Sequence, residues 1–191
     1  MNGSPDIIVP MKPIITAPNN VLTQEAKPVV AFDSELKRLI KDMKAALNAT
    51  RNPKGVGLAA PQIGVPYRVF ITKPKEDVVI RVFINPIVVK SSTTQTDGVP
   101  DRGNKLEGCL SIPTIWGYVK RAESVTLSYQ DEHGEKHTEK FTGFLATIIQ
   151  HETDHINGTL FTHRVLEQQG KFFQTGKDKD GKEVLEEIEL K

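Results

Sequence analysis

Residues 142–158 read Thr-Gly-Phe-Leu-Ala-Thr-Ile-Ile-Gln-His-Glu-Thr-Asp-His-Ile-Asn-Gly. Apolar residues recur through the first half of this stretch at helical spacing, which predicts a strongly apolar helix over about 143–157. Thr142 suits the N-cap of that helix, and Gly158 suits the position at which it stops. Because so apolar a helix must be shielded from water, we expect it to be central and buried.

The second half of the predicted helix carries the motif His151-Glu-x-x-His155. Residues four apart on a helix share one face, with Cβ atoms roughly 5–6 Å apart, so the two imidazoles can bind one divalent metal ion. Glu152 projects beside them and can accept a proton from metal-bound water without being a ligand. The alternative is a helix that carries two histidines for packing or solubility. The position of these residues favours the metal-binding interpretation. Polar side chains that follow a buried apolar stripe cost free energy of desolvation unless a partner such as a metal ion pairs with them.

Cys109 is the single cysteine, and it lies in the run Glu107-Gly-Cys-Leu-Ser111. Catalytic metal sites usually hold three protein ligands and keep a fourth position open, so two histidines leave such a site one ligand short. A lone cysteine is more often a small buried hydrophobe. The loop-like setting of Cys109 would nevertheless let a thiolate approach a helix, and Zn(II), Fe(II), Ni(II) and Co(II) all accept two nitrogens and one sulfur. On the residues alone, both interpretations stay open.

A glycine-rich stretch, Gly55-Val-Gly-Leu-Ala-Ala-Pro-Gln62, is the third candidate motif. It lacks the spacing and the following lysine of a phosphate-binding P-loop. It is either a tight turn that enters a strand or a segment whose glycines let a substrate backbone approach closely. In the second case the side-chain amide of Gln62 can donate to a developing oxyanion.

The composition is typical of an ordinary soluble protein. A length of 191 residues indicates a single domain over 1–191, with a Pro-rich extended arm at about 1–32 and a charged tail at about 177–191. The formal net charge of +1 gives no sign of a nucleic-acid or anionic-membrane partner. No apolar run approaches the roughly 18 residues that a membrane span needs. The start of the chain lacks the character of a signal peptide, and one cysteine fits a reducing compartment, so we expect a cytoplasmic protein.

The other elements follow from local patterns. An apolar stripe predicts a helix over about 34–49, with Asp33 or Ser34 as its N-cap. Short strands are predicted at 67–72, 78–85, 87–91, 119–130 and 136–142, with a polar loop at 93–104 and a turn at His133-Gly134. Because the strands do not alternate with helices, the fold class is α+β, with antiparallel sheets packed around the central, metal-binding helix.

Together, the three motifs resemble those of the peptide deformylases. That family carries a Gly-x-Gly-Leu-Ala-Ala-x-Gln motif, a Glu-Gly-Cys-x-Ser motif and a Gln-His-Glu-x-Asp-His motif, in that order. Here they are Gly55–Gln62, Glu107–Ser111 and Gln150–His155, all intact. The similarity spans about residues 12–165, so no motif supports the start of the arm or the tail.

The resemblance implies a hydrolase that removes the formyl group from the N-formyl-methionyl terminus of a nascent peptide, releasing formate. It implies one catalytic divalent metal, Fe(II) in the native family and replaceable by Ni, Co or Zn. The implied ligands are Cys109, His151 and His155. Glu152 is the implied general base and then acid, and the implied oxyanion donors are Gln62 and the backbone N–H of Leu110. A transient contact with the ribosome would follow from this substrate, not from any sequence feature.

By analogy, the methionine side chain enters an apolar pocket near the central helix. The candidates for that pocket are Val56, Phe144 and Ile148, and the glycines that would let the peptide pair as an added strand are Gly57 and Gly108. Two residues depart from the family. Trp116 stands near where some members carry a substrate-binding arginine, and Thr147 makes the pocket-facing side of the helix more polar.

Two other functions compete with this one. A metal-dependent endopeptidase would extend the pattern as His-Glu-x-x-His-x-x-Gly-x-x-His, but this chain has Phe161 at the last position and His163 two residues later. A protein that holds metal only for structure would need a fourth ligand, which His133, His137 or His163 would have to supply. Arg121 is expected to pair with an acidic residue of one of the motifs, Glu107 or Asp154.

Overall fold

The computed structural model describes residues 12–98 and 106–189. The expectations for residues 1–11 of the arm, for 99–104 of the polar loop and for 190–191 of the tail therefore lie outside the described residues. The described helices are η1 (Asn20–Leu22), α1 (Ser34–Ala49), η2 (Ala60–Ile63), α2 (Gly143–Ile156) and α3 (Phe161–Glu167), where η marks a 3₁₀-helix. Among the described residues, no helix is both long enough and apolar enough to cross a bilayer.

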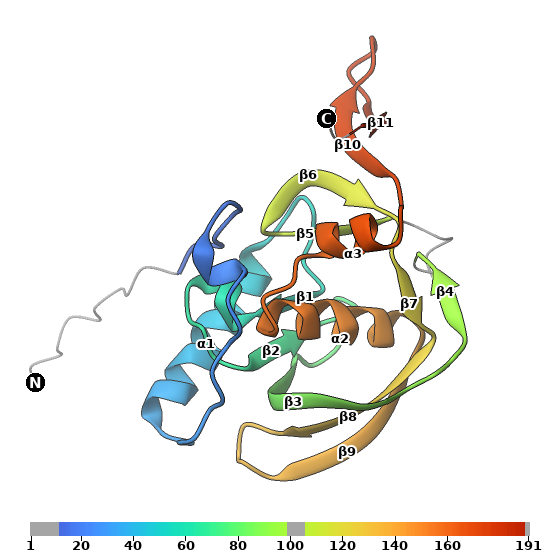
Figure 1. Cartoon of the computed structure of the whole chain (residues 1–191). Coiled ribbons are helices and arrows are strands. Elements are labelled where there is room, and N and C mark those ends of the chain that lie inside the picture. Colours follow the sequence, from blue (N-terminus) through green and yellow to red (C-terminus); the bar gives the residue numbers. More distant parts are fainter. Residues whose placement is uncertain (1–11, 99–105, 190–191) are drawn as a thin grey trace, which may run out of the picture.

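The strands form three antiparallel sheets (Figure 1). The five-stranded sheet has the order β1-β2-β3-β8-β9 and contains β1 (Gly57–Ala59), β2 (Val69–Thr72), β3 (Arg81–Ser91), β8 (Ser124–Gln130) and β9 (Lys136–Thr142). The four-stranded sheet has the order β11-β10-β6-β5 and contains β5 (Glu107–Cys109), β6 (Ile112–Gly117), β10 (Phe172–Lys177) and β11 (Glu183–Ile188). A small sheet pairs β4 (Gln95–Asp97) with β7 (Lys120–Ala122). The expected α+β class is confirmed.

Helix α2 lies at the centre of the molecule, as its apolar sequence predicts (Figure 1). It packs on β1, β2, β8 and β9, and Ile149 and Ile156 on it are completely buried. Thr142 occupies the N-cap position, but its side chain makes no capping hydrogen bond. Gly158 ends the helical stretch with φ 71°, and a Cβ there would lie 2.7 Å from the carbonyl oxygen of Thr23. Only glycine fits that position, so the helix must stop there.

Helix α1 has the predicted bounds and the predicted cap. The Asp33 side chain accepts hydrogen bonds from the backbone N–H groups of Glu35 and Leu36. The apolar stripe of the helix, including Met43 and Leu47, is buried against the five-stranded sheet. The arm, over its described part, follows irregular backbone that hydrogen-bonds to the rest of the fold, for example from Ala26 N to Ile156 O at 2.9 Å.

Several strand boundaries differ from the sequence prediction. The two strands expected at 78–85 and 87–91 are one strand, β3, because the irregularity at Asn85-Pro86 is absorbed as a shift of register against β8. Asn85 has φ 50°, and its side chain bonds both backbone polar groups of Val29, which compensates for the interrupted ladder. Pro86 itself has no N–H to donate.

Other predictions of single elements were wrong. The strand expected at 119–130 is two strands, β7 and β8, which belong to different sheets. The polar loop expected at 93–104 contains β4. The hydrogen bonds of β4 come from β7, a strand distant in sequence, so local apolar alternation is not needed to form β4.

The C-terminal part of the chain forms regular structure as well, where the sequence predicted no helix after α2 and left the structure of the tail open. Helix α3 follows α2, and β10 and β11 then form an antiparallel hairpin in register from Phe172↔Ile188 to Lys177↔Glu183. The side chain of Asp178 accepts hydrogen bonds from the backbone of Asp180 and Lys182, which fixes the turn. The charged tail expected at 177–191 therefore contains the turn and the second strand, β11, of this hairpin.

Candidate metal centre

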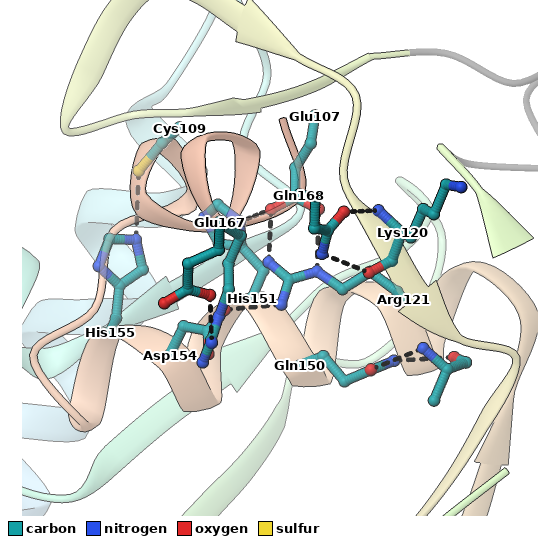
Figure 2. A network of polar contacts seen from close by, with 12 residues as sticks. Glu107, Cys109, Lys120, Arg121, Gln150, His151, Asp154, His155, Glu167 and Gln168 are labelled. Carbon is teal, nitrogen blue, oxygen red and sulfur yellow. Dashed lines mark hydrogen bonds and ion pairs between the residues drawn. The ribbon is translucent and has the colours of Figure 1, made fainter. Parts of the chain in front are cut away.

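Cys109, His151 and His155 converge beside α2 (Figure 2). One potential ligand atom from each residue lies within 4.8 Å of the other two. Cys109 ends β5, and its Sγ atom lies 3.2 Å from Nε2 of His155. The two histidines stand one helical turn apart, and their ring centroids are 5.0 Å apart. The residues alone left Cys109 open as a ligand, and the resemblance implied that it is one. The strand β5, which pairs with β6, carries its thiol to the helix.

A carboxylate fixes the orientation of one imidazole. Nδ1 of His151 lies 2.6 Å from Oε1 of Glu107, the acid of the cysteine motif. A hydrogen bond at Nδ1 directs the proton there and leaves Nε2 available for a metal, which is the arrangement that metal-binding histidines commonly show. Nδ1 of His155, in contrast, is buried with no hydrogen-bond partner among the described residues.

Glu107 belongs to a buried ionic network (Figure 2). Arg121, on β7, donates two hydrogen bonds to Glu107, at 2.6 and 3.1 Å, and one to Asp154 at 2.6 Å. The expected pairing of Arg121 is thus confirmed for both acids. Arg164 on α3 approaches Asp154 from the other side at 2.7 Å. Arg164 was not predicted from the sequence, because nothing in its local pattern distinguishes it from a surface charge.

The charges of this network hold its acids ionised. Burial alone would raise the pKa of the Glu107 carboxyl, but the charge of Arg121 and the contact with His151 keep that pKa well below its usual range. Asp154 is buried as well, and hydrogen bonds from Arg164 together with the charge of Arg121 lower its pKa. The resulting stabilisation exists above the ordinary carboxyl pKa of about 4 and is lost as the pH falls through the lower folded-state values.

Replacing Arg121 by methionine is expected to destabilise the fold by about 3–5 kcal/mol, because it leaves the Glu107 carboxylate buried without its cation. The measurement is denaturant unfolding at neutral pH. Lys120→Met is the matched control, since Lys120 is the neighbouring residue on β7 but is exposed and 3.7 Å from Asp97. That change should cost no more than about 1 kcal/mol. Equal effects of the two substitutions would contradict a structural role for the network.

The thiol of Cys109 is held in a form suited to metal. Burial would raise its pKa, but the charge of His155 and hydrogen bonds with both histidines lower the pKa to about 5. The thiolate is the form that binds metal ions. The backbone N–H of Ser111 and Nε2 of Gln62 also point at the sulfur, at 3.4 and 3.5 Å. Gln62 is further fixed through Oε1, which accepts from Ala59 N, and through Nε2, which donates to Ser111 Oγ.

Glu152 lies next to the three candidate ligands and is only 4% exposed. Burial raises the pKa of its carboxyl to about 7. Its Oε2 atom has no hydrogen-bond partner among the described residues. A Cβ at Gly57 would come within 2.3 Å of Oε1, so glycine at that position leaves the room that the carboxylate occupies. Buried polar atoms without partners are rare and costly, and a water-bearing divalent metal in front of Glu152 would supply what is missing. The donor set therefore fits such a metal.

A cleft of about 730 Å³ opens in front of these residues. It brings together all of the candidates predicted for substrate binding, namely Val56, Gly57, Gly108, Phe144 and Ile148, as well as Gln62, Leu110, Trp116 and Thr147. The cleft also has lining residues that the sequence did not indicate, above all those of the C-terminal hairpin. They follow the last recognisable motif, and only the pairing of β10 with β6 places them at the site.

The remaining histidines do not complete the metal group within the described residues. That group contains Cys109, His151 and His155, whereas His137 pairs with Asp131 at 2.9 Å in a separate, partly exposed cluster. Phe161, at the position of the last histidine in the longer protease pattern, is buried and stacks on the His151 ring. A three-ligand site with an adjacent carboxylate is typical of a catalytic metal, while structural sites are usually closed by a fourth protein ligand.

Proteins of known family resemble this chain in sequence. The family model described as polypeptide deformylase matches residues 11–171. A peptide deformylase of Chlorobium luteolum is 41% identical over 160 residues, which cover 80% of this chain and 77% of that protein. A peptide deformylase of Rhizobium meliloti is 42% identical over 154 residues, covering 79% and 83%.

Solved structures agree with the sequence relatives. A peptide deformylase from Legionella pneumophila superposes with a TM-score of 0.70 at 38% identity, covering 79% of this chain and 83% of that one. One from Thermotoga maritima gives a TM-score of 0.73 at 33% identity, covering 82% and 98%. The family model spans most of the chain, including all three motifs and helix α2, and so this chain belongs to the polypeptide deformylase family.

Proposed function

We propose that this chain deformylates nascent peptides with one divalent metal held by Cys109, His151 and His155, and with Glu152 as the residue that moves the proton. The observation that supports the proposal best is the convergence of a thiol and two imidazoles beside a buried, unpartnered carboxylate oxygen. As a member of its family, the chain is a metal-dependent hydrolase that removes the N-formyl group from the N-terminal formyl-methionine of nascent polypeptides and releases formate.

A divalent metal at this site, when bound, supplies a Lewis acid and lowers the pKa of water from 15.7 toward ~7. Glu152 accepts the proton of the water that attacks the formyl carbon. It then returns a proton to the leaving nitrogen, because an amide anion is too poor a leaving group otherwise. Its buried position, which raises the pKa of the carboxyl to about 7, suits a group that must take up and release a proton near neutral pH.

The oxyanion of the tetrahedral intermediate needs fixed donors. Gln62 is the first candidate, because its side-chain Nε2 lies 3.5 Å from Cys109 Sγ at the edge of the metal group. The backbone N–H of Leu110, the residue after the cysteine, is the second, and Leu110 lines the cleft. Such donors stabilise charge best when their positions are set before the reaction. The contacts of Gln62 with Ala59 and Ser111 set its position.

The cleft suits an extended peptide with a methionine side chain. Val56, Phe144 and Ile148 provide apolar surface close to Glu152 and form the proposed methionine pocket. Gly57 on β1 and Gly108 on β5 line the cleft and have no side chain to hold a strand away. A peptide lying between them would gain backbone hydrogen bonds as an added strand.

The native metal, by our proposal, is Fe(II), with Zn(II), Ni(II) or Co(II) able to replace it. A set of two imidazoles and one thiolate accommodates all of these ions. We place the reaction in the cytoplasm, where nascent peptides and a reduced thiol occur together. A transient contact with the ribosome, near the point at which the peptide emerges, completes the proposal.

Formate release tests this function directly. Protein purified without oxygen and loaded with Fe(II) or Ni(II) should release formate from formyl-Met-Ala-Ser, and EDTA-treated protein should not. Restoring the metal to the EDTA-treated sample should restore the activity. A folded, metal-loaded protein that releases no formate would refute the proposal.

An internally quenched peptide with a blocked N-terminus separates this function from that of an endopeptidase. We expect no cleavage of internal peptide bonds, because Phe161 fills the position that a third histidine would take in the longer protease motif. Metal-dependent internal cleavage would instead support the endopeptidase.

A further inference from the structure

We propose that the C-terminal hairpin β10–β11 is a wall of the substrate cleft that selects an apolar side chain in the peptide after the formyl-methionine. The inference rests on the proposed function and deepens it. The hairpin begins at Phe172, just beyond the region 11–171 that the family model matches. Residues of both of its strands nevertheless line the same cleft as Cys109, His151 and Glu152.

Strand register places the hairpin side chains on the cleft side of the four-stranded sheet. Trp116 on β6 is paired with Phe173, and Thr175 is paired with Leu185. Directly paired residues, and residues two apart on one strand, point to the same face of a sheet. All four residues line the cleft, so one face of this sheet forms its wall. Figure 1 shows the hairpin extending the sheet beyond β6, away from the five-stranded sheet.

A hydrogen bond ties the hairpin to the part of the cleft where the peptide backbone would lie. Nε1 of Trp116 donates to Oγ1 of Thr175 at 2.8 Å. The Trp116 ring lies over Gly108, where an added Cβ would be 2.6 Å from ring atoms. Gly108 is one of the two glycines proposed to pair with the peptide. A residue that passes Gly108 therefore meets the Trp116 ring, whose position depends on the hairpin.

The wall exposes apolar surface that a substrate side chain would cover. Leu185 is 51% exposed and Tyr118 is 43% exposed, and both line the cleft. Tyr118 is supported by an edge contact with Phe173, whose ring centroid is 5.8 Å away. Grouped exposed apolar residues at the mouth of a site are typical of binding surfaces. An aliphatic side chain after the methionine would bury part of this surface at no polar cost, whereas an amide of similar size would lose hydrogen bonds to water on doing so.

The hairpin also reaches the opposite rim of the cleft. Nδ2 of Asn52 donates to Oε1 of Glu183 at 3.4 Å, and the two residues after Asn52, Pro53 and Lys54, line the cleft. The hairpin thus bounds the cleft at the end where Pro53 and Lys54 lie. Its base is part of the core, because Phe172 is buried with Val165 and Phe161. Point substitutions therefore test the wall better than a truncation.

The test compares kcat/KM for formyl-Met-Leu-Ser and formyl-Met-Asn-Ser. The wild-type protein should prefer the leucine peptide. Leu185→Ala should reduce that preference roughly threefold to tenfold, through a higher KM for the leucine peptide with kcat unchanged. Leu166→Ala is the matched control, since Leu166 is 53% exposed on α3 and is not among the residues that line the cleft. It should leave the preference unchanged.

A second pair of variants tests the link to Trp116. Thr175→Val keeps the shape but removes the acceptor for the indole N–H, and it should reduce the preference as well. Thr175→Ser keeps the acceptor and should retain the preference. The inference would be overturned if the wild-type protein showed no preference for the leucine peptide. It would also be overturned if Leu185→Ala protein, still active on formyl-Met-Ala-Ser, kept the full preference. Absence of formate from every peptide would instead overturn the proposed function on which it rests.

Discussion

Replacing Cys109 by serine is expected to remove the metal and the activity together. The thiol is the one soft donor of the proposed site, and its pKa, lowered to about 5, keeps it in the thiolate form that binds metal. A serine hydroxyl stays protonated at neutral pH and is a poor ligand. His155→Ala should have the same result, since it removes the imidazole 3.2 Å from the sulfur. The measurements are metal stoichiometry by elemental analysis after anaerobic loading and formate release on the same samples.

His163→Ala is the matched control for the ligand substitutions. His163 lies on α3, is exposed, and is not part of the Cys109 group. The control should keep a full complement of metal and full activity. A Cys109→Ser protein that retained metal at the wild-type stoichiometry would show that the ligand set is wrong.

Replacing Glu152 by glutamine or alanine is expected to lower turnover by a factor of roughly 10²–10⁴ while the metal stays bound. Glutamine preserves the shape of the side chain but cannot accept the proton from water. Because Glu152 is proposed as a proton carrier and not as a ligand, the variants should lose turnover without losing metal. The measurements are kcat for formyl-Met-Ala-Ser and metal stoichiometry, taken for both variants.

Glu167→Gln is the control for Glu152→Gln. Glu167 is the exposed partner of Arg164 on α3, and its removal should leave turnover unchanged. If the Glu152 variants lost metal along with turnover, Glu152 would be mainly structural. If deformylation survived in them at the wild-type rate, the assignment of the general base would be wrong.

Much of the candidate site could be predicted from the sequence because its chemistry is encoded over short distances. The spacing of His151 and His155 fixes their geometry once the segment is helical, and the helix itself follows from an apolar stripe. Gln62 and Glu107 could be identified from the sequence because they belong to intact short motifs. Arg121 was expected to pair with a motif acid, although the sequence did not indicate that it pairs with two.

The parts that the sequence missed depend on partners far away along the chain. β4, β5 and β10 are short and carry little apolar alternation, so their formation depends on the strands to which they pair. Arg164 looks like any surface arginine until α3 brings it 2.7 Å from Asp154. Leu185 lies in a charged stretch whose composition resembles that of a solvated tail.

The sequence by itself thus determined the α+β class, the central helix with its metal-binding motif, and the family to which the chain belongs. The tertiary structure alone decided that one buried arginine pairs with both Glu107 and Asp154, that Glu107 contacts His151, and that the C-terminal hairpin lines the cleft. The physical reason is the range of the interactions. Helical spacing and turn chemistry act over a few residues, whereas strand pairing and buried ion pairs join residues whose proximity is set only when the whole chain is packed.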